Sequence, residues 1–219
     1  VDMVTGVARG RNVLVMWLDG RGGEDADNPV SSPIYYVEST DAGNTFGPNT
    51  KLQTPFRGTA CACCTLDAQF ESDGTLSVLF RTGYKNVRDV WLLQRAPGGE
   101  AFSAVRVSDD RWSVATCPMD GPRYAHGEGR PVVVWMSDQR LYWAERAGET
   151  FQPRQKLSEG VGKYPEVARG PSGDLLALWQ EQRTVRWRYL PTGETGTLPG
   201  TGHRAAIAVG ADGRFRIVN

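Results

Sequence analysis

The sequence predicts an all-β protein built from repeated antiparallel units, and three observations support this prediction. A turn pattern of eight residues recurs along the chain, and each copy ends in an aromatic residue. Short apolar runs, rich in β-branched and aromatic residues, follow turns as strands do. No segment of about a dozen residues carries the apolar stripe of an amphipathic helix.

The clearest copy of the turn pattern runs from Ser39 to Phe46 and reads Ser-Thr-Asp-Ala-Gly-Asn-Thr-Phe. The side chains of Ser39 and Asp41 can accept hydrogen bonds from turn amides, and Gly43 can adopt a positive φ without steric cost. We expect the ring of Phe46 to pack the turn against the outgoing strand. This octapeptide therefore predicts a tight hairpin.

Two weaker copies of the pattern follow at residues 95–102 and 144–151, with a fragment at 191–195. Superposition of the copies gives a glycine column and an aromatic column, which contain Gly43, Gly99 and Gly148, and Phe46, Phe102 and Phe151. The aromatic residues are 56 and 49 residues apart. This spacing fits one four-stranded β-propeller blade better than a helical repeat.

Apolar runs that precede each turn complete the repeat. The predicted central strands are residues 13–18, 76–80, 132–136, 175–179 and 215–218, and the strands that lead into the turns are residues 34–38, 90–94, 141–145 and 185–189. The pattern predicts four nearly whole blades and two strands of a fifth, at residues 1–56, 57–110, 111–160, 161–202 and 203–219. We expect all of them to belong to a single propeller domain.

The composition agrees with a turn-rich globular chain and argues against some partners. The 219 residues include 26 Gly and 13 Pro, and 25 Lys and Arg balance 25 Asp and Glu, so the formal net charge is zero. Without a basic cluster there is no electrostatic case for nucleic acid. No apolar run is long enough for a transmembrane helix.

The octapeptide, of the form Ser-x-Asp-x-Gly-x-Thr-aromatic, resembles the Asp-box, the hairpin motif of the sialidase-like (BNR repeat) β-propellers. The resemblance is closest from Val13 to Phe46, where Trp17 to Arg21 is similar to the strand end and Asp-Gly-Arg turn of a bacterial sialidase domain. It implies a propeller of six blades. Six blades of roughly 45 to 50 residues exceed this chain, so we expect further blades upstream of Val1.

The resemblance also implies candidate catalytic and binding residues. Sialidases take their acid/base aspartate from the loop that matches Glu24 to Pro29, which points to Asp25 or Asp27. Asp67 lies where those enzymes carry another aspartate, and Arg21 is a candidate ligand contact. The resemblance thus offers a glycoside hydrolase of the exo-sialidase type as one possible function.

The chain departs from the sialidase pattern at the site that anchors the substrate carboxylate. Sialidases use an arginine of an Arg-Ile-Pro motif there, because a guanidinium binds a carboxylate in bidentate fashion. The corresponding register falls on Asp2 to Val4, where an aspartate would repel an anionic sugar. Tyr164 and Glu166 are two residues apart and would share one strand face, but the family takes its nucleophilic pair from different blades. We therefore expect no hydrolysis of sialosides, and treat both residues as candidate binding residues.

The four cysteines form a second candidate site. Cys61, Cys63 and Cys64 make a Cys-x-Cys-Cys run, and Cys117 opens a Cys-Pro-x-x-Gly-Pro run, a pairing similar to that in a subgroup of uncharacterised bacterial sialidase-like repeat proteins. Alignment places Cys63 and Cys117 at equivalent points of neighbouring blades, so we expect the four sulfurs to cluster. They could form disulfides, bind a soft metal such as copper(I) or zinc, or remain free thiols.

Carboxylates at the starts of the inner strands form a third candidate site. Alignment places Asp67, Asp120 and Glu166 at similar levels of three successive blades, where they could hold a cation or raise one another's pKa. The alternative is that each caps a turn or pairs with an arginine such as Arg81, Arg88 or Arg123. The acidic loop at residues 24–28 could also hold calcium, although it lacks the full EF-hand spacing.

Together these features favour a secreted or periplasmic protein that binds a glycan, a peptide or a partner protein, with the cysteine cluster near the binding face. The even cysteine count supports the extracytoplasmic location. The alternative is a glycosidase with Asp25 or Asp27 as acid/base.

Overall fold

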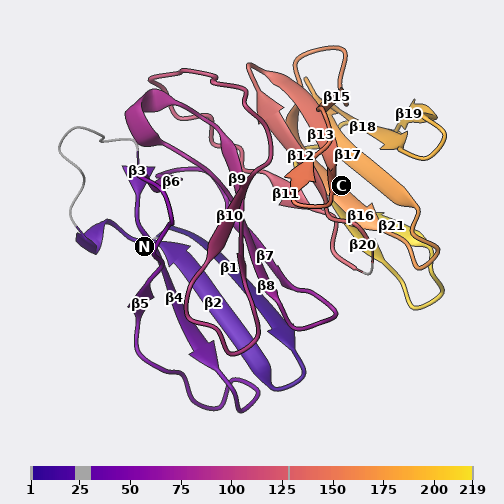
Figure 1. Ribbon diagram of the computed structural model, residues 1–219. Helices are drawn as coiled ribbons and strands as arrows, with labels where there is room; N and C mark the ends of the chain where they lie inside the picture. Colours follow the sequence, from indigo (N-terminus) through magenta and orange to yellow (C-terminus); the bar gives the residue numbers. More distant parts are fainter. Residues whose placement is uncertain (1, 23–30, 128, 219) are drawn as a thin grey trace. The chain divides into compact units, whose positions relative to one another are not determined.

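Antiparallel strands make up almost all of the regular structure in a computed structural model that describes residues 2–22, 31–127 and 129–218 (Figure 1). The helical segments within these ranges are single 3-10 turns at Gly20–Gly22 and Tyr84–Asn86. The chain divides into two units after Gly121. No helix in the described ranges is long and apolar enough to span a membrane.

The first unit contains two four-stranded sheets and a short two-stranded pair. The first sheet consists of β1 (Asp2–Arg9), β2 (Asn12–Leu18), β4 (Ile34–Ser39) and β5 (Thr50–Lys51), in that order. The second consists of β7 (Asp67–Phe70), β8 (Leu76–Arg81), β9 (Val90–Arg95) and β10 (Ser103–Arg106). Between them in sequence, β3 (Ser31–Ser32) pairs with β6 (Ala60–Cys61). Each larger sheet is an up-and-down meander, as in a propeller blade.

The second unit repeats this arrangement. Its first sheet consists of β11 (Arg123–Tyr124), β12 (Val132–Ser137), β13 (Arg140–Ala147) and β14 (Thr150–Phe151), and β15 (Gln155–Lys156) also pairs with β13. Its second sheet consists of β16 (Lys163–Arg169), β17 (Leu175–Glu181), β18 (Thr184–Tyr189) and β19 (Thr195–Thr197). The strands β20 (Ala206–Val209) and β21 (Phe215–Val218) form a final hairpin.

The central strands carry the core because both of their faces are covered. All six residues of β8 are buried, as are all six of β12. In the first unit one apolar cluster joins residues of both larger sheets, including Leu14, Met16, Phe80 and Leu93. Burying one such side chain contributes about 1.5–3 kcal/mol to stability. These continuous apolar runs are what identified the strands in the sequence, and the predicted strand positions are confirmed.

The turn at Ser39 forms the hydrogen bonds that its sequence predicts. Ser39 Oγ accepts from the amide of Gly43 at 2.9 Å, and Asp41 Oδ1 accepts from the amide of Thr45 at 2.9 Å. The Thr45 hydroxyl donates to Asp41 Oδ2 at 2.6 Å. The two bonds from Thr45, together with one from the Ser39 hydroxyl to Asp41 Oδ1 at 2.7 Å, lower the pKa of Asp41 to about 2. Gly43 has a φ of +84°, as its position in the turn requires.

The later copies of the turn differ from the alignment in two ways. In the second copy the positive φ belongs to Gly98, at +70°, so the glycine column is one residue out of register there. The three aromatic residues all lie just after the third strand of their sheets, but their environments differ. Phe102 is buried in the core at 9% exposure, whereas Phe46 is 45% exposed. The ring of Phe46 still lies against its turn, because a Cβ added at Gly43 would be 4.0 Å from its Cζ. Phe151 lies within β14 and is half-buried.

Candidate functional site

Several of the predicted site residues are held by local contacts. Asp25 and Asp27 lie outside the described residues. Arg21 pairs with the buried Asp19 at 2.7 Å, and its guanidinium lies 5.2 Å from the ring centroid of Tyr35. Hydrogen bonds from Arg21 hold the pKa of Asp19 below its usual range. Arg21 thus closes the turn after β2, while about half of its side chain stays exposed.

Each of the three predicted carboxylates lies in a setting of its own unit. Asp67 is buried at the start of β7, where its Oδ1 accepts from the amide of Ala68 at 2.9 Å. Asp120 is also buried, and its amide donates to the sulfur of Cys64. Glu166 belongs to the second unit and accepts from Arg123 Nε at 2.9 Å, which is the plain ion pair considered as the alternative. A shared cation site for all three carboxylates stays a prediction.

Tyr164 and Glu166 do not follow the simple alternation expected for one strand face. The pairing of β16 with β17 shifts by one residue between Lys163 and Glu166, which marks a β-bulge. Tyr164 has a φ of +53° in this bulge, and the guanidinium of Arg204 lies 4.5 Å from its ring centroid. The bulge sends the two side chains to different partners, so the expectation of a shared face was wrong.

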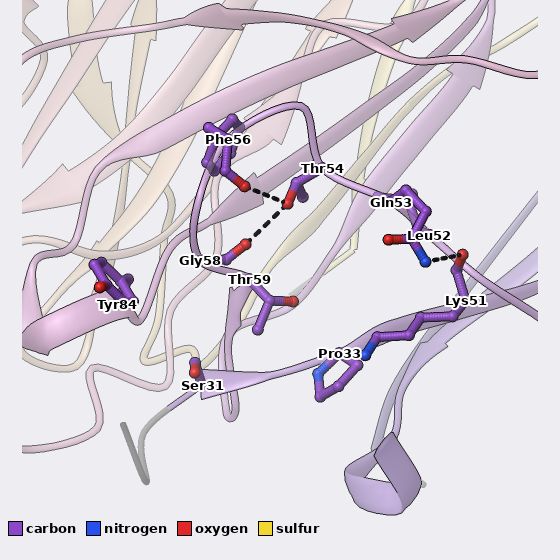
Figure 2. A pocket seen from close by; sticks show the side chains of 10 residues that line it. All are labelled: Ser31, Pro33, Lys51, Leu52, Gln53, Thr54, Phe56, Gly58, Thr59 and Tyr84. Carbon is purple, nitrogen blue, oxygen red and sulfur yellow. Dashed lines mark hydrogen bonds between the residues drawn. The ribbon is translucent and has the colours of Figure 1, made fainter. Parts of the chain in front are cut away.

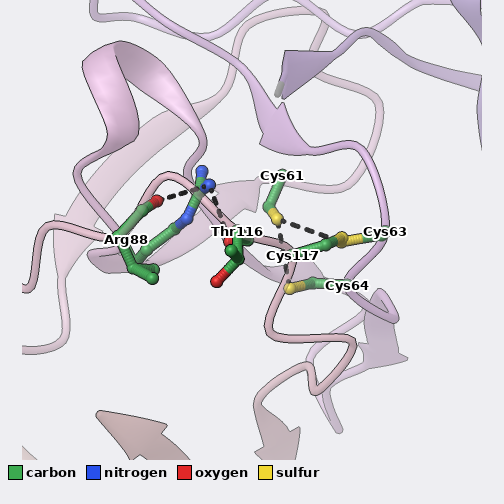
Figure 3. The surroundings of a disulfide bond; sticks show 7 residues. Cys61, Cys63, Cys64, Arg88, Thr116 and Cys117 are labelled. Carbon is green, nitrogen blue, oxygen red and sulfur yellow. Dashed lines mark hydrogen bonds between the residues drawn. A yellow bond between two sulfur atoms is a disulfide. The ribbon is translucent and has the colours of Figure 1, made fainter. Parts of the chain in front are cut away.

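The four cysteines cluster as expected, within the first unit. A disulfide joins Cys63 to Cys117, across a sequence separation of 54, while Cys61 and Cys64 are not bridged. Figure 3 shows the four sulfurs side by side: Cys61 Sγ lies 3.7 Å from Cys63 Sγ and 3.2 Å from Cys64 Sγ. The prediction of a disulfide is confirmed for one pair. The sulfurs of Cys61, Cys63 and Cys117 lie within 4.8 Å of one another, a spacing that would also allow a metal ion if the disulfide were reduced.

Two buried arginines lie close to this cluster, whereas the sequence suggested them only as partners for the inner-strand carboxylates. Arg81, at the end of β8, and Arg88, just before β9, are both fully buried. Arg88 Nη2 donates to the carbonyls of Val114 at 3.0 Å and Thr116 at 3.4 Å, so it anchors the segment that leads into Cys117. The signal available in the sequence was an arginine on each side of a turn between two apolar strands.

Sequence reasoning missed a pocket in the first unit. Its cavity has a volume of about 300 Å³ and is lined by Ser31, Pro33, Lys51, Leu52, Gln53, Thr54, Phe56, Gly58, Thr59 and Tyr84. These residues come from three separate segments, so no linear motif marks them. Figure 2 shows Lys51 and Tyr84 on opposite sides of the hollow.

Hydrogen bonds and close packing shape the walls of this pocket. The Thr54 hydroxyl bridges the carbonyls of Phe56 and Gly58, each at 2.9 Å, and so closes the loop (Figure 2). A Cβ at Gly58 would lie 2.8 Å from Tyr84 Cβ, so only glycine allows the ring to approach this loop. The ring of Phe56 stacks on Trp91 at 4.2 Å.

The pocket and the cysteine cluster are joined by a pair of strands, β3 and β6. Ser31, in the pocket lining, pairs with Cys61 across β3 and β6. The Thr59 hydroxyl donates to the carbonyl of Ser32 at 2.9 Å and holds the same two segments together. Cys61 is therefore the direct pairing partner of a residue in the pocket wall.

Solved structures with the same arrangement of strands identify the fold. A fucose-specific lectin from Aleuria aurantia matches 91% of this chain and 62% of its own, with 12% identity and a TM-score of 0.59. A GH93 α-L-arabinofuranosidase of Fusarium graminearum, in complex with arabinobiose, matches 93% and 65%, with 13% identity and a TM-score of 0.58. A Trypanosoma rangeli sialidase mutant that displays trans-sialidase activity matches 96% and 41%, with 10% identity and a TM-score of 0.58. This chain has the fold of the sialidase-like β-propellers.

The similarity to these propellers is one of fold. The chain spans less than two thirds of the length of each of the three structures. No family model matches the chain, and no curated protein matches it.

Proposed function

We propose that this propeller is an extracytoplasmic binding protein that takes a small polar ligand, such as a sugar residue of a glycan, in the pocket between Lys51 and Tyr84. The observation that carries the proposal is the chemistry of the lining. Tyr84 and Lys51 lie on opposite sides of a cavity of about 300 Å³, and Ser31, Gln53 and Thr59 also line it (Figure 2). A largely preformed pocket with a few convergent polar groups is typical of small-ligand sites.

The lining favours binding over hydrolysis. Glycosidases commonly use two carboxyl groups that flank the scissile bond, and none of the described lining residues is acidic. Lys51 instead supplies a positive charge, which suits a neutral or acidic sugar. The hydrolase alternative rests on Asp25 and Asp27 and on the resemblance to sialidases.

The location and the repeat family are part of the same proposal. The disulfide between Cys63 and Cys117 supports an oxidising compartment, because such bridges persist in secreted and periplasmic proteins. The side-chain hydrogen bonds of Ser39 and Asp41 support an Asp-box, and with it a BNR-type repeat.

A binding assay with matched variants tests the proposal. We expect titration calorimetry, after a screen of neutral and acidic monosaccharides and short glycans, to find a ligand whose affinity falls about tenfold or more in Tyr84→Ala and in Lys51→Ala, since each loses a direct contact. Lys163→Ala, an exposed lysine of the second unit, is the control and should bind as the wild type does. Equal affinity in all four proteins would place the ligand elsewhere. Release of a fluorophore from aryl glycosides, lost in Asp25→Asn or Asp27→Asn, would favour the hydrolase.

A further inference from the structure

The cysteine cluster combines a disulfide with two thiols in van der Waals contact. Cys61 Sγ lies 3.7 Å from Cys63 Sγ, one end of the disulfide, and 3.2 Å from Cys64 Sγ (Figure 3). Thiol–disulfide exchange requires a thiolate that reaches one sulfur of a disulfide. Cys61 is placed to reach Cys63, and Cys64 is placed to reach Cys61.

Solvent exposure of the cysteines increases from Cys64 and Cys61, through Cys63, to Cys117. Cys61 and Cys64 are buried, at 1% and 2% exposure. Cys63 is half-buried, and Cys117 is exposed. The disulfide thus has one end at the surface, while its other end contacts a thiol pair that solvent does not reach.

The surroundings of Cys61 favour its thiolate. Hydrogen bonding from Cys64 lowers the pKa of Cys61, with further help from the amide of Cys63 and the charges of Arg88 and Arg81, which outweigh burial. The pKa of Cys64 is raised, first by its hydrogen bond to Cys61 and then by burial, so it remains a thiol. One sulfur is thereby a nucleophile and the next a proton donor.

The same arginines argue for exchange rather than for metal binding. Both are fully buried, and Nε and Nη1 of Arg88 have no hydrogen-bond partner within the described part of the chain. Buried guanidinium groups stabilise a thiolate, but they oppose the entry of a cation. Arg88 also anchors the carbonyls of Val114 and Thr116, just ahead of Cys117. It therefore positions the segment that carries the leaving sulfur.

We propose that Cys61, Cys63, Cys64 and Cys117 form a thiol–disulfide exchange centre, in which the disulfide moves between the Cys63–Cys117 pair, which has one end at the surface, and the buried Cys61–Cys64 pair. The Cys61 thiolate attacks Cys63 Sγ, a Cys61–Cys63 bond forms, the Cys63–Cys117 bond breaks, and Cys117 leaves as a thiolate. The exposed Cys117 thiolate takes a proton from water, Cys64 loses its proton, and the Cys64 thiolate attacks Cys61 Sγ. A Cys61–Cys64 bond forms, the Cys61–Cys63 bond breaks, and Cys63 leaves as a thiolate. No oxidant is consumed, because each step forms one disulfide bond and breaks one.

The exchange releases two thiols that can react with a disulfide of another molecule. After it, the half-buried Cys63 and the exposed Cys117 are a dithiol, and Cys61 and Cys64 are a buried disulfide. Cys117 can attack an external disulfide and release one thiol, and Cys63 then attacks the mixed disulfide and releases the second. The external disulfide gains two electrons, and the protein gains a second disulfide. The substrates are therefore disulfides that can reach Cys117.

Alkylation of the folded protein tests the proposal. Trypsin yields residues 58–81, which hold Cys61, Cys63 and Cys64, and residues 112–123, which hold Cys117. The native protein is incubated with excess maleimide and no reductant, quenched in acid, digested and analysed by mass spectrometry. We expect maleimide on Cys117 together with an internal disulfide in residues 58–81, at a rate independent of protein concentration. A static disulfide would keep the two peptides linked and Cys117 unlabelled, which would overturn the proposal.

Two variants assign the steps. Cys61→Ser removes the attacking sulfur and should slow labelling of Cys117 by about tenfold or more. Cys64→Ser should still label Cys117, because the first step needs only Cys61. Circular dichroism confirms folding, and Cys61→Ala serves if the serine variant does not fold. Equal labelling of Cys117 with and without Cys61, or four thiolates with a stoichiometric metal ion in the purified protein, would overturn the proposal.

Discussion

Single side chains set the local structure of the first hairpin. Ser39, Asp41 and Thr45 satisfy the turn amides and one another through five hydrogen bonds that the sequence order alone makes possible. Such short-range bonds form within a few residues and depend little on the rest of the fold. For this reason the first hairpin was predictable residue by residue, whereas the contacts of Arg88 and Tyr84 were not.

We predict that Asp41 stabilises the fold in a pH-dependent way. Its pKa in the folded protein is about 2, below the ordinary value near 3.9, mainly because Thr45 donates two hydrogen bonds to the charged form. The stabilisation should be complete above about pH 4 and should be lost as the pH falls toward 2. Asp41→Asn should therefore be less stable than the wild type at neutral pH, with a gap that narrows in acid, as measured by urea unfolding.

The control for this prediction is Thr45→Val, which removes the hydroxyl donor and keeps the carboxyl group. The pKa of Asp41 should rise toward its ordinary value in this variant, as followed by NMR titration of the carboxyl carbon. An unchanged pKa would show that Thr45 is not the cause.

At the scale of elements, the starting point of the fourth strand decides whether the aromatic residue of each turn is buried. Phe102 is followed at once by Ser103, the first residue of β10, so the strand holds its ring over the core. Phe46 lies four residues before β5, in a loop, and its ring stays partly exposed. Phe46 and Phe102 thus occupy equivalent positions along the chain, but the burial of each ring depends on where the fourth strand starts.

Alanine substitution should separate these two phenylalanines. Phe102→Ala should lower the free energy of unfolding by about 3–5 kcal/mol, because it removes a ring from a packed core. Phe46→Ala should cost less than about 1 kcal/mol, because its ring is already partly in water. Denaturant unfolding of both variants measures the difference. Similar losses for both would mean that the ring of Phe46 is packed as deeply as that of Phe102.

At the scale of the whole molecule, the repeated sheets form two units, and the first unit contains a disulfide bond. The Cys63–Cys117 bridge ties the start of the second sheet to the segment that follows it. The expected six blades and the blades upstream of Val1 remain predictions. The zero net charge sets no strong long-range field, so specificity rests on local pockets and side chains.

Reduction should destabilise the protein through this link. A bridge across 54 residues is worth about 4 kcal/mol in the chain-entropy model, since it restricts the unfolded chain. We expect a strong reductant to lower the denaturation midpoint of the wild type and to have little effect on Cys117→Ser, which lacks the bridge. If a chelator lowered the midpoint and the reductant did not, the cysteines would hold a metal instead.

The sequence by itself determined the strands, their meander order, the hairpin at Ser39 and the grouping of the cysteines. Those features follow from apolar runs, turn residues and spacing, which act over short distances along the chain. Only the tertiary structure decided that Cys63 pairs with Cys117 while Cys61 and Cys64 stay as thiols, and that Lys51 meets Tyr84 across a pocket. These juxtapositions depend on how separate segments pack against one another, and no local pattern encodes that.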